Sequence, residues 1–333
     1  MKAMKKLTMQ DIADKLGISK SAVSLALSDK YGVSDELRSL VTISAIEMGY
    51  VFQKVKKAKR LKNDCVALIL GSDINTKSLF WIDIIKGVES AVNAHKYALQ
   101  IIVSNTLSPD EIAMRLIHSK CKGIISMAGF NKEILASVKR LELPVVLIDS
   151  SDYVGYNLYS QVRATNYASG FDAAAYLINK GHRRLAFAGD LRFASYAQRA
   201  DGFRAACEEK GVYFMRRNIE GEDARQILKM LSGKDRPTAV FAPNDYLASI
   251  VCDACAKFNL SIPRDISVIG FDNIQDPLLK YRLTTFDLPK KAMGEAAVKQ
   301  LLKEISDTST PKECVELACT FIERDTAGPA PDC

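Results

Sequence analysis

The 333-residue chain has few of the residues and patterns from which many active sites are built. It contains one Trp and three His, and His95, His118 and His182 are too far apart for the usual ligand spacing of a zinc site. No GxGxxG, GxxxxGK[ST] or GxSxG pattern occurs, so the common signatures of dinucleotide, nucleotide and serine-hydrolase sites are missing. The sequence therefore favours neither an enzyme, nor a cofactor, nor a metal site.

Long apolar runs are also missing. No run approaches the roughly 20 residues that span a bilayer. The first ten residues, MKAMKKLTMQ, are basic but have no apolar core of the kind found in secretion signals. We therefore expect a cytoplasmic protein that does not bind membranes. A hydrophobic content of 48% and a charged content of 26% are typical of soluble globular proteins, and the length favours two or three domains.

The eight cysteines are scattered through apolar segments. Without a secretion signal we expect them to be reduced and mostly packed in the interior. Cys252 and Cys255 form a CxxC pattern, which redox and metal sites share. They lie in DYLASIVCDACAKF, a helical pattern with no second ligand pair nearby, which favours two neighbours on one helix.

The most informative stretch is TMQDIADKLGISKSAVSLALS, residues 8–28. Its spacing predicts a helix, a tight turn and a second helix. Thr8 and Asp11 have the pattern of a capping box, Gly17 can take the left-handed conformation that ends a helix, and Ser19 can cap the second helix.

The second helix of this stretch has two distinct faces. Val23 and Ala26 are expected to point inward with Ala22 and Leu27, which leaves an outer face of Lys20, Ser21, Ser24 and Leu25. A third helix is expected from Ser34, its cap, to Gly49. Two short helices joined by a glycine turn are the shape that places its second helix in a DNA major groove.

The charge distribution favours the same function. Residues 1–62 carry 13 Lys and Arg against 6 Asp and Glu, a net charge of +7, which equals the net charge of the whole chain. Binding to phosphates needs such a local excess of cations. The segment that follows the helices, residues 51–64 (VFQKVKKAKRLKND), is too charged to form a core and is expected to be a linker that orders on a polyanion.

From Cys65 onward, short apolar runs alternate with amphipathic helical runs. The expected strands are 66–70, 99–103, 123–127, 145–149, 184–189, 239–243 and 266–271. The expected helices are 80–95, 109–119, 131–141, 167–180, 195–210, 222–232 and 245–258. Such alternation predicts an α/β core of doubly wound parallel sheets, and two series in tandem predict two lobes.

Short polar side chains follow several of the expected strands. Ligands of doubly wound sheets bind beyond the carboxyl ends of the strands, and aromatic residues stand near these ends in the sequence. Polar groups combined with aromatic faces are typical of a site for a small polyhydroxylated molecule. The alternative, which stays open at this point, is that these Asn and Asp residues cap the helices that follow.

These motifs resemble the LacI/GalR family of bacterial transcription regulators over nearly the whole chain. Residues 8–50 resemble the family's helix-turn-helix headpiece. Blocks such as LPVVLID, LINKGHRRLAFAGD, YAQRADGF, AVFAPND, IPRDISVIGFDN and LTTFDLPKKAMGEAA occur in the family's order. A single such block would be weak, but together with the headpiece they are highly specific.

The resemblance implies a homodimeric regulator, usually a repressor, whose affinity for a palindromic operator changes when a small effector, expected to be a sugar or sugar derivative, binds between two core lobes. It implies a headpiece at 1–50, a basic hinge at 51–64 and a periplasmic-binding-protein-like core at 65–325. Lobe one is expected at about 65–161 and 289–318, lobe two at about 162–288 and 319–325, and a disordered tail at 326–333.

The resemblance also assigns site residues. Lys20 and Ser21 hold the positions that most often select bases, followed by Ser24 and Leu25, and leucine can contact a thymine methyl group. The residues that match phosphate-contacting or positioning residues are Thr8, Ser19, Ser34 and Tyr50. The residues that match effector contacts are Arg199, Asn244 and Asp272, together with Ser72, Phe80 and Trp81.

The hinge departs from the family pattern. Relatives usually place a leucine there, which wedges into the central minor groove. In this chain Lys56 and Lys59 stand at the usual small residue and at the leucine, and Leu61 lies two residues further on. We therefore keep two hinge mechanisms open, binding through charge and insertion of Leu61.

Two other classes of protein compete with this interpretation. A sugar-transport binding protein shares the core fold but would need an export signal and no headpiece. A DNA-binding protein without effector control would keep the headpiece and the fold, and an effector titration of operator binding separates it from a regulated one.

Overall fold

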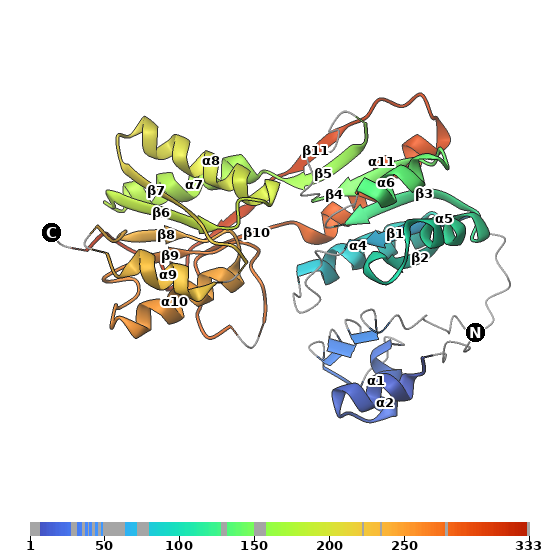
Figure 1. The fold of residues 1–333 in the computed structure, drawn as a ribbon, viewed down its shortest axis with the longest axis horizontal. Helices are drawn as coiled ribbons and strands as arrows, with labels where there is room; N and C mark the ends of the chain where they lie inside the picture. The colour runs from blue at the N-terminus through green and yellow to red at the C-terminus, as the bar shows by residue number, and fades with distance from the viewer. Residues whose placement is uncertain are drawn as a thin grey trace. The chain divides into compact units, whose positions relative to one another are not determined.

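The structure is a computed structural model that describes residues 7–27, 32–34, 37–38, 40–41, 44–45, 48, 64–71, 80–127, 132–149, 158–221, 223–233, 235–276 and 279–331. The chain divides into two compact units, residues 1–146 with 298–310 and residues 147–297 with 311–333. Each unit is described by itself below. Figure 1 traces the chain and labels its elements.

The first unit begins with the two expected helices, α1 (Met9–Leu16) and α2 (Lys20–Leu27). The predicted capping box is confirmed, because the Asp11 carboxylate accepts from the backbone N–H of Thr8 at 2.7 Å while the Thr8 hydroxyl accepts from the backbone N–H of Asp11 at 3.3 Å. Gly17 ends α1 with φ 65°, which is accessible to glycine at little cost. Further helical residues lie at 37–38, 40–41 and 44–45.

The small core of this region joins the three helical stretches. It consists of the buried side chains of Ile12, Ala13, Val23, Ala26, Val41 and Ala45. The prediction that Val23 and Ala26 point inward is thus confirmed. Ala22 and Leu27, expected beside them, are only partly buried.

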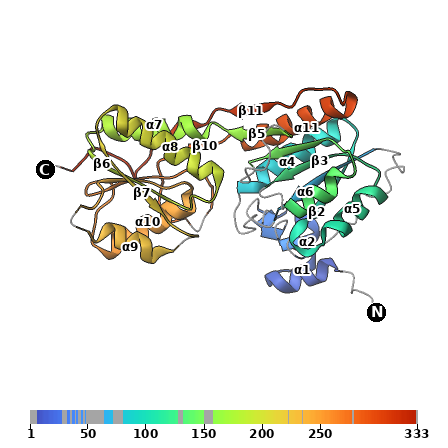
Figure 2. The same cartoon turned by 45° about the horizontal axis from the view of Figure 1, so that its top comes forward.

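An α/β layer follows within the first unit. Its strands are β1 (Cys65–Leu70), β2 (Ala98–Val103), β3 (Cys121–Met127) and the start of β4 (Val145–Ile148), in the order β2-β1-β3-β4. β1 pairs in parallel with both β2 and β3. Its helices are α4 (Phe80–Ala94), α5 (Pro109–His118) and α6 (Lys132–Lys139), with the 3-10 turn η1 (Ser104–Thr106) after β2. Helices α5 and α6 contact each other (Figure 2).

The second unit contains a parallel four-stranded sheet in the order β7-β6-β8-β9. Its strands are β6 (Arg184–Gly189), β7 (Tyr213–Asn218), β8 (Ala239–Phe241) and β9 (Ser267–Ile269). The helices of the unit are α7 (Asn166–Asn179), α8 (Ala194–Glu209), α9 (Ala224–Leu231), α10 (Asp245–Lys257) and the start of α11 (Lys290–Ser306). β5 (Ser160–Ala164) pairs in parallel with β11 (Cys314–Leu317), and β10 (Thr285–Asp287) pairs antiparallel with β12 (Thr320–Ile322).

Alternate residues of β6 and β8 are buried against different helices. Ala186, Ala188 and Val240 pack with side chains of α9 and α10. The ring of Phe187 instead meets the ring of Phe241 edge to face, and Phe203 of α8 stacks on Phe241 with ring centres 5.6 Å apart. Coverage of both faces explains why these strands are apolar at nearly every position. Figure 1 shows α7 and α8 on one face of this sheet and α9 and α10 on the other.

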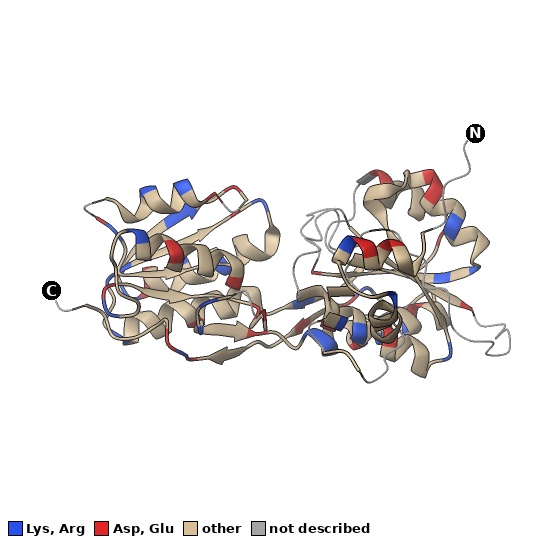
Figure 3. Cartoon of the chain, turned by 90° about the horizontal axis from the view of Figure 1, so that it is seen from below, with Lys and Arg blue, Asp and Glu red and all other residues tan. Residues whose placement is uncertain are grey.

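The α/β fold class with an N-terminal helix-turn-helix is confirmed, and each expected strand and helix of the core is present with shifts of a few residues at its ends. Five strands, β5, β7, β10, β11 and β12, had no prediction. Figure 3 shows Lys and Arg interspersed with Asp and Glu over the elements of each unit. Among the described residues no helix is both long and apolar enough to cross a membrane.

The expectation of a disordered tail is wrong for residues 326–331. Thr326 and Ala327 are buried, and the Thr326 hydroxyl donates to the Val268 carbonyl at 2.8 Å and accepts from the Thr284 N–H at 2.8 Å. The tail was misread because its small and proline residues look like a linker, whereas its backbone and hydroxyl groups complete the hydrogen bonds of β9 and the adjoining chain.

Candidate DNA-binding and effector-binding sites

The outer face of α2 carries the polar residues that the sequence assigned to DNA. Lys20, Ser21 and Ser24 are exposed and Leu25 is partly buried, while Val23 on the opposite face is fully buried. The short core therefore fixes which side chains of α2 face outward, which a recognition helix requires. The arginine of the third helical stretch supports this helix, because Arg38 Nη1 donates to the carbonyls of Leu25 and Ala26, both at 3.3 Å.

Three residues expected at phosphates all cap the start of a helix. In addition to Thr8, Ser19 Oγ accepts from the Ala22 N–H at 3.1 Å and Ser34 Oγ accepts from the Leu37 N–H at 3.2 Å. A capped helix N-terminus has outward N–H groups and a positive dipole end, both of which suit phosphate oxygens. The capping role and a positioning role on DNA are therefore compatible in these residues.

Five of the expected site residues lie outside the described residues, namely Tyr50, Lys56, Lys59 and Leu61 of the DNA-binding set and Ser72 of the effector set. Phe80 and Trp81 of the effector set stand at the start of α4. Their rings meet edge to face at 4.6 Å, and Phe80 is 6% exposed whereas Trp81 is half-buried. Phe80 is therefore mainly a packing residue, and Trp81 is the more accessible ring of the two.

Arg199 is the centre of the candidate effector site in the second unit. It lies on α8 and is 2% exposed. Its Nε donates to Asn166 Oδ1 at 3.0 Å and its Nη1 donates to the Pro243 carbonyl. The guanidinium carbon lies 3.5 Å from the centre of the Phe271 ring, a stacking arrangement that fixes the plane of the group. Nη2 makes no hydrogen bond with any described residue, so it is left to donate to a ligand.

Asp272 supplies a buried carboxylate without a hydrogen-bond donor. Its side chain is 8% exposed, and no described residue donates a hydrogen bond to it. Burial raises the pKa of this carboxyl well above its usual value, an effect that Arg199 opposes. Its φ of 104° lies in the left-handed region that favours glycine, and such strain tends to persist where function demands it. A buried acceptor without a donor is costly and is typical of a site that a ligand completes.

Both polar groups of the Asn244 side chain are already hydrogen-bonded within the protein, as the helix-capping alternative predicts. Its Oδ1 accepts from the Leu247 N–H at 2.7 Å and so caps α10, while its Nδ2 donates to the Tyr196 hydroxyl at 2.9 Å. Burial raises the pKa of Tyr196 to about 12, so this phenol stays neutral. The Tyr196 hydroxyl keeps its own proton for donation, and Asn244 thus acts by orienting Tyr196.

The sequence also places two further carboxylates at strand ends without assigning them to the effector: Asp149 is the last residue of one expected strand, and Asp245 lies two residues after another. Asp149 has a pKa raised by burial and lowered in part by Arg199, and no described residue donates a hydrogen bond to it. Asp245 instead accepts from the Thr285 hydroxyl at 2.7 Å and the Ile274 N–H at 2.8 Å, and burial raises its pKa to about 6. Asp149 therefore resembles Asp272, whereas Asp245 has a structural role.

A polar hollow adjoins this cluster within the second unit. Its lining includes residues at the start of α7 and at the start of α8, and also Asp149. The residues that line it are Asp149, Gln161, Arg163, Asn166, Ala194, Ser195 and Gln198. Asn166, which lines the hollow, also accepts a hydrogen bond from Arg199. The hollow therefore adjoins the candidate effector site around Arg199. No group of three or more His, Cys, Asp or Glu among the described residues is arranged to hold a metal ion.

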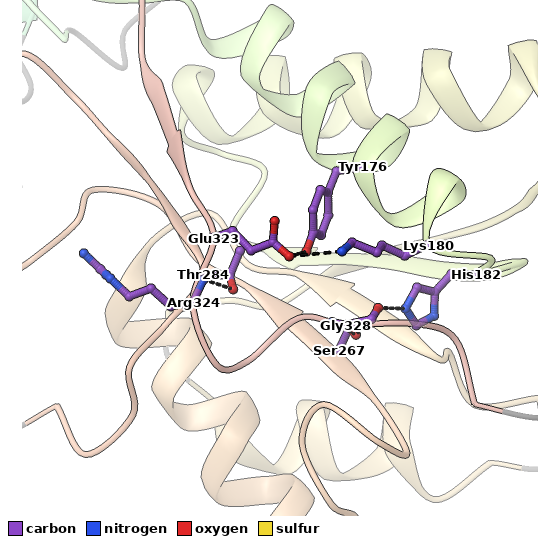
Figure 4. A network of polar contacts seen from close by, with 8 residues as sticks. All are labelled: Tyr176, Lys180, His182, Ser267, Thr284, Glu323, Arg324 and Gly328. Carbon is purple, nitrogen blue, oxygen red and sulfur yellow. Dashed lines mark hydrogen bonds and ion pairs between the residues drawn. The ribbon is translucent and has the colours of Figure 1, made fainter.

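Residues near the C-terminus hold the turn that carries Asp272 in place. Arg324 donates from Nη2 to Asn273 Oδ1 at 2.6 Å and from Nη1 to the Leu283 carbonyl at 3.0 Å, and so holds the turn that carries Asp272. Figure 4 shows the neighbouring contacts of this segment, in which Glu323 accepts from Tyr176 and Lys180, and Gly328 meets His182.

His182 contacts Gly328 of this C-terminal segment, and its protonation gives a pH-dependent prediction. Its imidazole is fully buried between Thr238 Oγ1 at 3.0 Å and the Gly328 carbonyl at 3.1 Å, and burial lowers its pKa below the usual 6.5. The unfolded chain then binds the proton more readily, so the contribution of His182 to stability is complete above pH 6.5 and is lost as pH falls through the lowered folded pKa. We expect His182→Gln to flatten the fall in melting temperature below pH 6.5, and an NMR titration of the wild-type imidazole to give a pKa below 6.5. A wild-type pKa above 6.5 would contradict this.

Both the N-terminal helical region and the core of the chain match known protein families. A family model described as bacterial regulatory proteins, lacI family, matches residues 8–52, and one described as a periplasmic binding protein-like domain matches residues 174–327. The HTH-type transcriptional repressor PurR of Vibrio vulnificus (strain CMCP6) is 30% identical over 336 residues, which cover 96% of this chain and 98% of that protein.

Solved structures agree on the fold. The transcriptional regulator CelR–cellobiose complex aligns with a TM-score of 0.70 and 20% identity over 96% of this chain and 99% of its own. The lac repressor dimer bound to operator and the anti-inducer ONPF aligns with a TM-score of 0.68 and 19% identity over 97% and 100%.

A helix-turn-helix unit joined to a periplasmic-binding-protein-like core defines a DNA-binding transcription regulator. The chain belongs to the lacI family of bacterial regulatory proteins. The curated relatives that it matches are transcriptional repressors rather than enzymes.

Proposed function

We propose that this protein is a dimeric repressor that binds a palindromic operator through its headpiece and changes its operator affinity when a small carbohydrate binds at Arg199, Tyr196 and Asp272. The observation that carries the effector part is the juxtaposition of unused groups, since Arg199 Nη2 lacks an acceptor and Asp272 lacks a donor among the described residues. A ligand hydroxyl both donates and accepts, so it satisfies both groups at once.

The chemistry of the surrounding residues favours a neutral polyhydroxylated effector. Phe271 and Tyr196 present aromatic rings beside Arg199, at 3.5 and 5.4 Å from its guanidinium carbon. Asp149 and Asp272 add carboxyl groups, which can hydrogen-bond to ligand hydroxyl groups. The CelR structure contains cellobiose, which supports a carbohydrate for this chain as well. A site of this kind discriminates against analogues that lack a hydroxyl, because its own polar groups are then left unpaired.

Operator recognition is proposed to depend on Lys20 and Ser21. A two-fold dimer reads two-fold DNA, with one headpiece on each half-site. We expect Lys20→Ala and Ser21→Ala each to relax base preference at one or two positions per half-site, by roughly 1–3 kcal/mol at each position. In vitro selection of binding sites with each variant measures this change. The control is Lys257→Ala, which alters an exposed lysine on α10 outside the headpiece. This control variant should select the same site as the wild type. If the double variant Lys20→Ala, Ser21→Ala selected the same site as the wild type, α2 would not be the reading helix.

The basic segment 51–64 is proposed to act mainly through charge. Its six cations are Lys54, Lys56, Lys57, Lys59, Arg60 and Lys62. Each phosphate contact adds about 0.9 to the slope of log affinity against log salt. We therefore expect Lys56→Ala with Lys59→Ala to reduce this slope by about 2 per subunit, and Leu61→Ala to leave slope and affinity nearly unchanged. A large loss of affinity and of DNA bending in Leu61→Ala would show instead that Leu61 is a minor-groove wedge.

A single experiment tests the proposed function as a whole. The operator is first selected from random DNA with the purified protein, and operator binding is then titrated with a panel of neutral mono- and disaccharides. We expect one selected palindrome and at least one sugar that changes its affinity. Selection of no palindromic site would overturn the proposal.

A further inference from the structure

Two cysteines of the first unit lie opposite each other on neighbouring strands. Cys65 begins β1 and Cys121 begins β3, and the two are register partners in the parallel pairing, with a register shift directly after them. Neighbouring strands lie about 4.7–4.9 Å apart, which is inside the range of about 4.4–6.8 Å between Cα atoms that a disulfide requires. The Cys65 thiol donates to the Val66 carbonyl at 3.6 Å and to Gln100 Oε1 at 3.9 Å, and the Cys121 thiol donates to the Gly123 carbonyl at 3.1 Å.

The pair lies near the rim of the sheet. Both thiol side chains are buried, at 5% and 7% exposure. The residues next to them in the chain, Asp64 and Lys122, form an ion pair at 3.7 Å and have side chains that are 56% and 46% exposed. The pair therefore lies at the ends of its two strands, next to exposed side chains.

The two thiols are chemically unequal. The neighbouring Cys121 side chain lowers the pKa of Cys65, while Cys65 and burial raise the pKa of Cys121. The thiolate is the reactive form of cysteine. Cys65 is therefore the group that attacks, and Cys121 is the neighbour that resolves the product.

We propose that Cys65 and Cys121 form a redox pair that hydroperoxides convert to a disulfide. In the first step the Cys65 sulfur attacks the O–O bond of the hydroperoxide, which leaves Cys65 as a sulfenic acid and releases an alcohol, or water from hydrogen peroxide. In the second step the Cys121 sulfur attacks the Cys65 sulfur and displaces the hydroxyl group, which leaves as water with the Cys121 proton. The two thiols lose two electrons in total, and the hydroperoxide gains them. A thiol reductant reverses the reaction by exchange.

The position of the pair gives the disulfide a structural consequence. Cys65 directly follows the basic segment 51–64, and the cross-link would tie the first strand of the core to β3. Cross-linking residues that are far apart in sequence restricts the unfolded chain. Oxidation is therefore expected to raise the melting temperature of the protein, and reduction is expected to lower it again.

The chain contains a matched internal control. Cys252 and Cys255 are also two neighbouring buried cysteines, three residues apart on α10. Burial raises the pKa of both thiols, that of Cys255 to about 12. Under a dose of oxidant that converts the Cys65–Cys121 pair, Cys252 and Cys255 should remain reduced.

The test uses the full-length reduced protein and hydrogen peroxide. After exposure the remaining thiols are alkylated in denaturant, and the peptides are analysed by mass spectrometry without reduction. We expect a Cys65–Cys121 linked peptide that disappears after dithiothreitol treatment, together with alkylated Cys252 and Cys255. In Cys121→Ser, which lacks the resolving thiol, we expect dimedone to label a sulfenic acid at Cys65.

Two results would overturn the proposal. One is the absence of the linked peptide at doses that already oxidise the exposed Cys314. The other is oxidation of Cys252 and Cys255 at the same dose as Cys65, which would show general loss of structure rather than a built site. The wild-type linked peptide needs no substitution, so misfolding of a variant cannot produce either result.

Discussion

Replacing Asp272 with alanine should abolish the response to the effector and leave effector-free operator binding intact. The carboxylate accepts no hydrogen bond from a described residue, so its loss leaves no hydrogen-bond donor of the second unit unpaired. Removing a buried carboxyl without a donor should also leave the melting temperature unchanged or raise it. The effector commonly shifts affinity by about 1–3 kcal/mol in regulators of this kind, and Asp272→Ala should show no shift.

The matched control for this variant is Asp201→Ala. Asp201 lies on α8 two residues from Arg199, but its side chain is on the surface and pairs with Arg216 at 3.0 Å. We expect this variant to keep both the effector response and operator affinity, since exposed ion pairs contribute little. Operator affinity and melting temperature are measured on both variants. A joint loss of stability and operator binding in Asp272→Ala would show that Asp272 has only a structural role.

Replacing Gly202 with alanine should destabilise the second unit severely. Helices α7 and α8 cross so closely that a Cβ atom on Gly202 would lie 1.9 Å from the Tyr167 carbonyl oxygen, and one on Gly170 would lie 2.0 Å from the Arg199 carbonyl oxygen. Both contacts are with backbone, which cannot rotate away as a side chain can. We expect a loss of roughly 3 kcal/mol or more and a fall in melting temperature of at least about 6 °C.

Gly233→Ala is the control for this prediction. A Cβ atom at Gly233 would meet nothing within 4 Å, and we expect its effect to stay within about 0.5 kcal/mol. The same crossing places Arg199 beside Asn166, so Gly202→Ala should also weaken effector binding at temperatures where the protein is still folded. A Gly202→Ala protein that melts with the wild type would show that the helices do not cross this closely.

The elements with a strong apolar pattern were predictable from sequence, and the polar ones were not. β1 and β6 are apolar at nearly every position because both faces of their sheets are covered. β7 lies at the edge of its sheet, and its sequence YFMRRN exposes most side chains, so it has neither an apolar run nor regular alternation. β11 is similarly half-exposed. Edge strands depend on pairing with a distant segment, which sequence periodicity does not report.

The candidate site divides along the same line. That Asn244 and Asp272 follow strands could be read from the sequence, because polar residues come directly after apolar runs. The sequence could not show which of these acceptors lacks a hydrogen-bond donor. That depends on contacts between distant residues, such as those between Asn244 and Tyr196 and between Asp245 and Thr285. The ordered segment 326–331 was missed for the same reason.

Reciprocal linkage between effector and operator is the most direct test of the central claim that one molecule couples the two sites. Calorimetric titration with the sugar found in the panel gives its Kd in the absence and in the presence of saturating operator, and DNA binding gives the operator Kd with and without the sugar. Thermodynamic linkage requires the two ratios to be equal, and we predict a ratio of about 5–150 for the wild type and no sugar binding for Asp272→Ala. A sugar that binds the wild type with the same Kd whether or not operator is present would contradict the account.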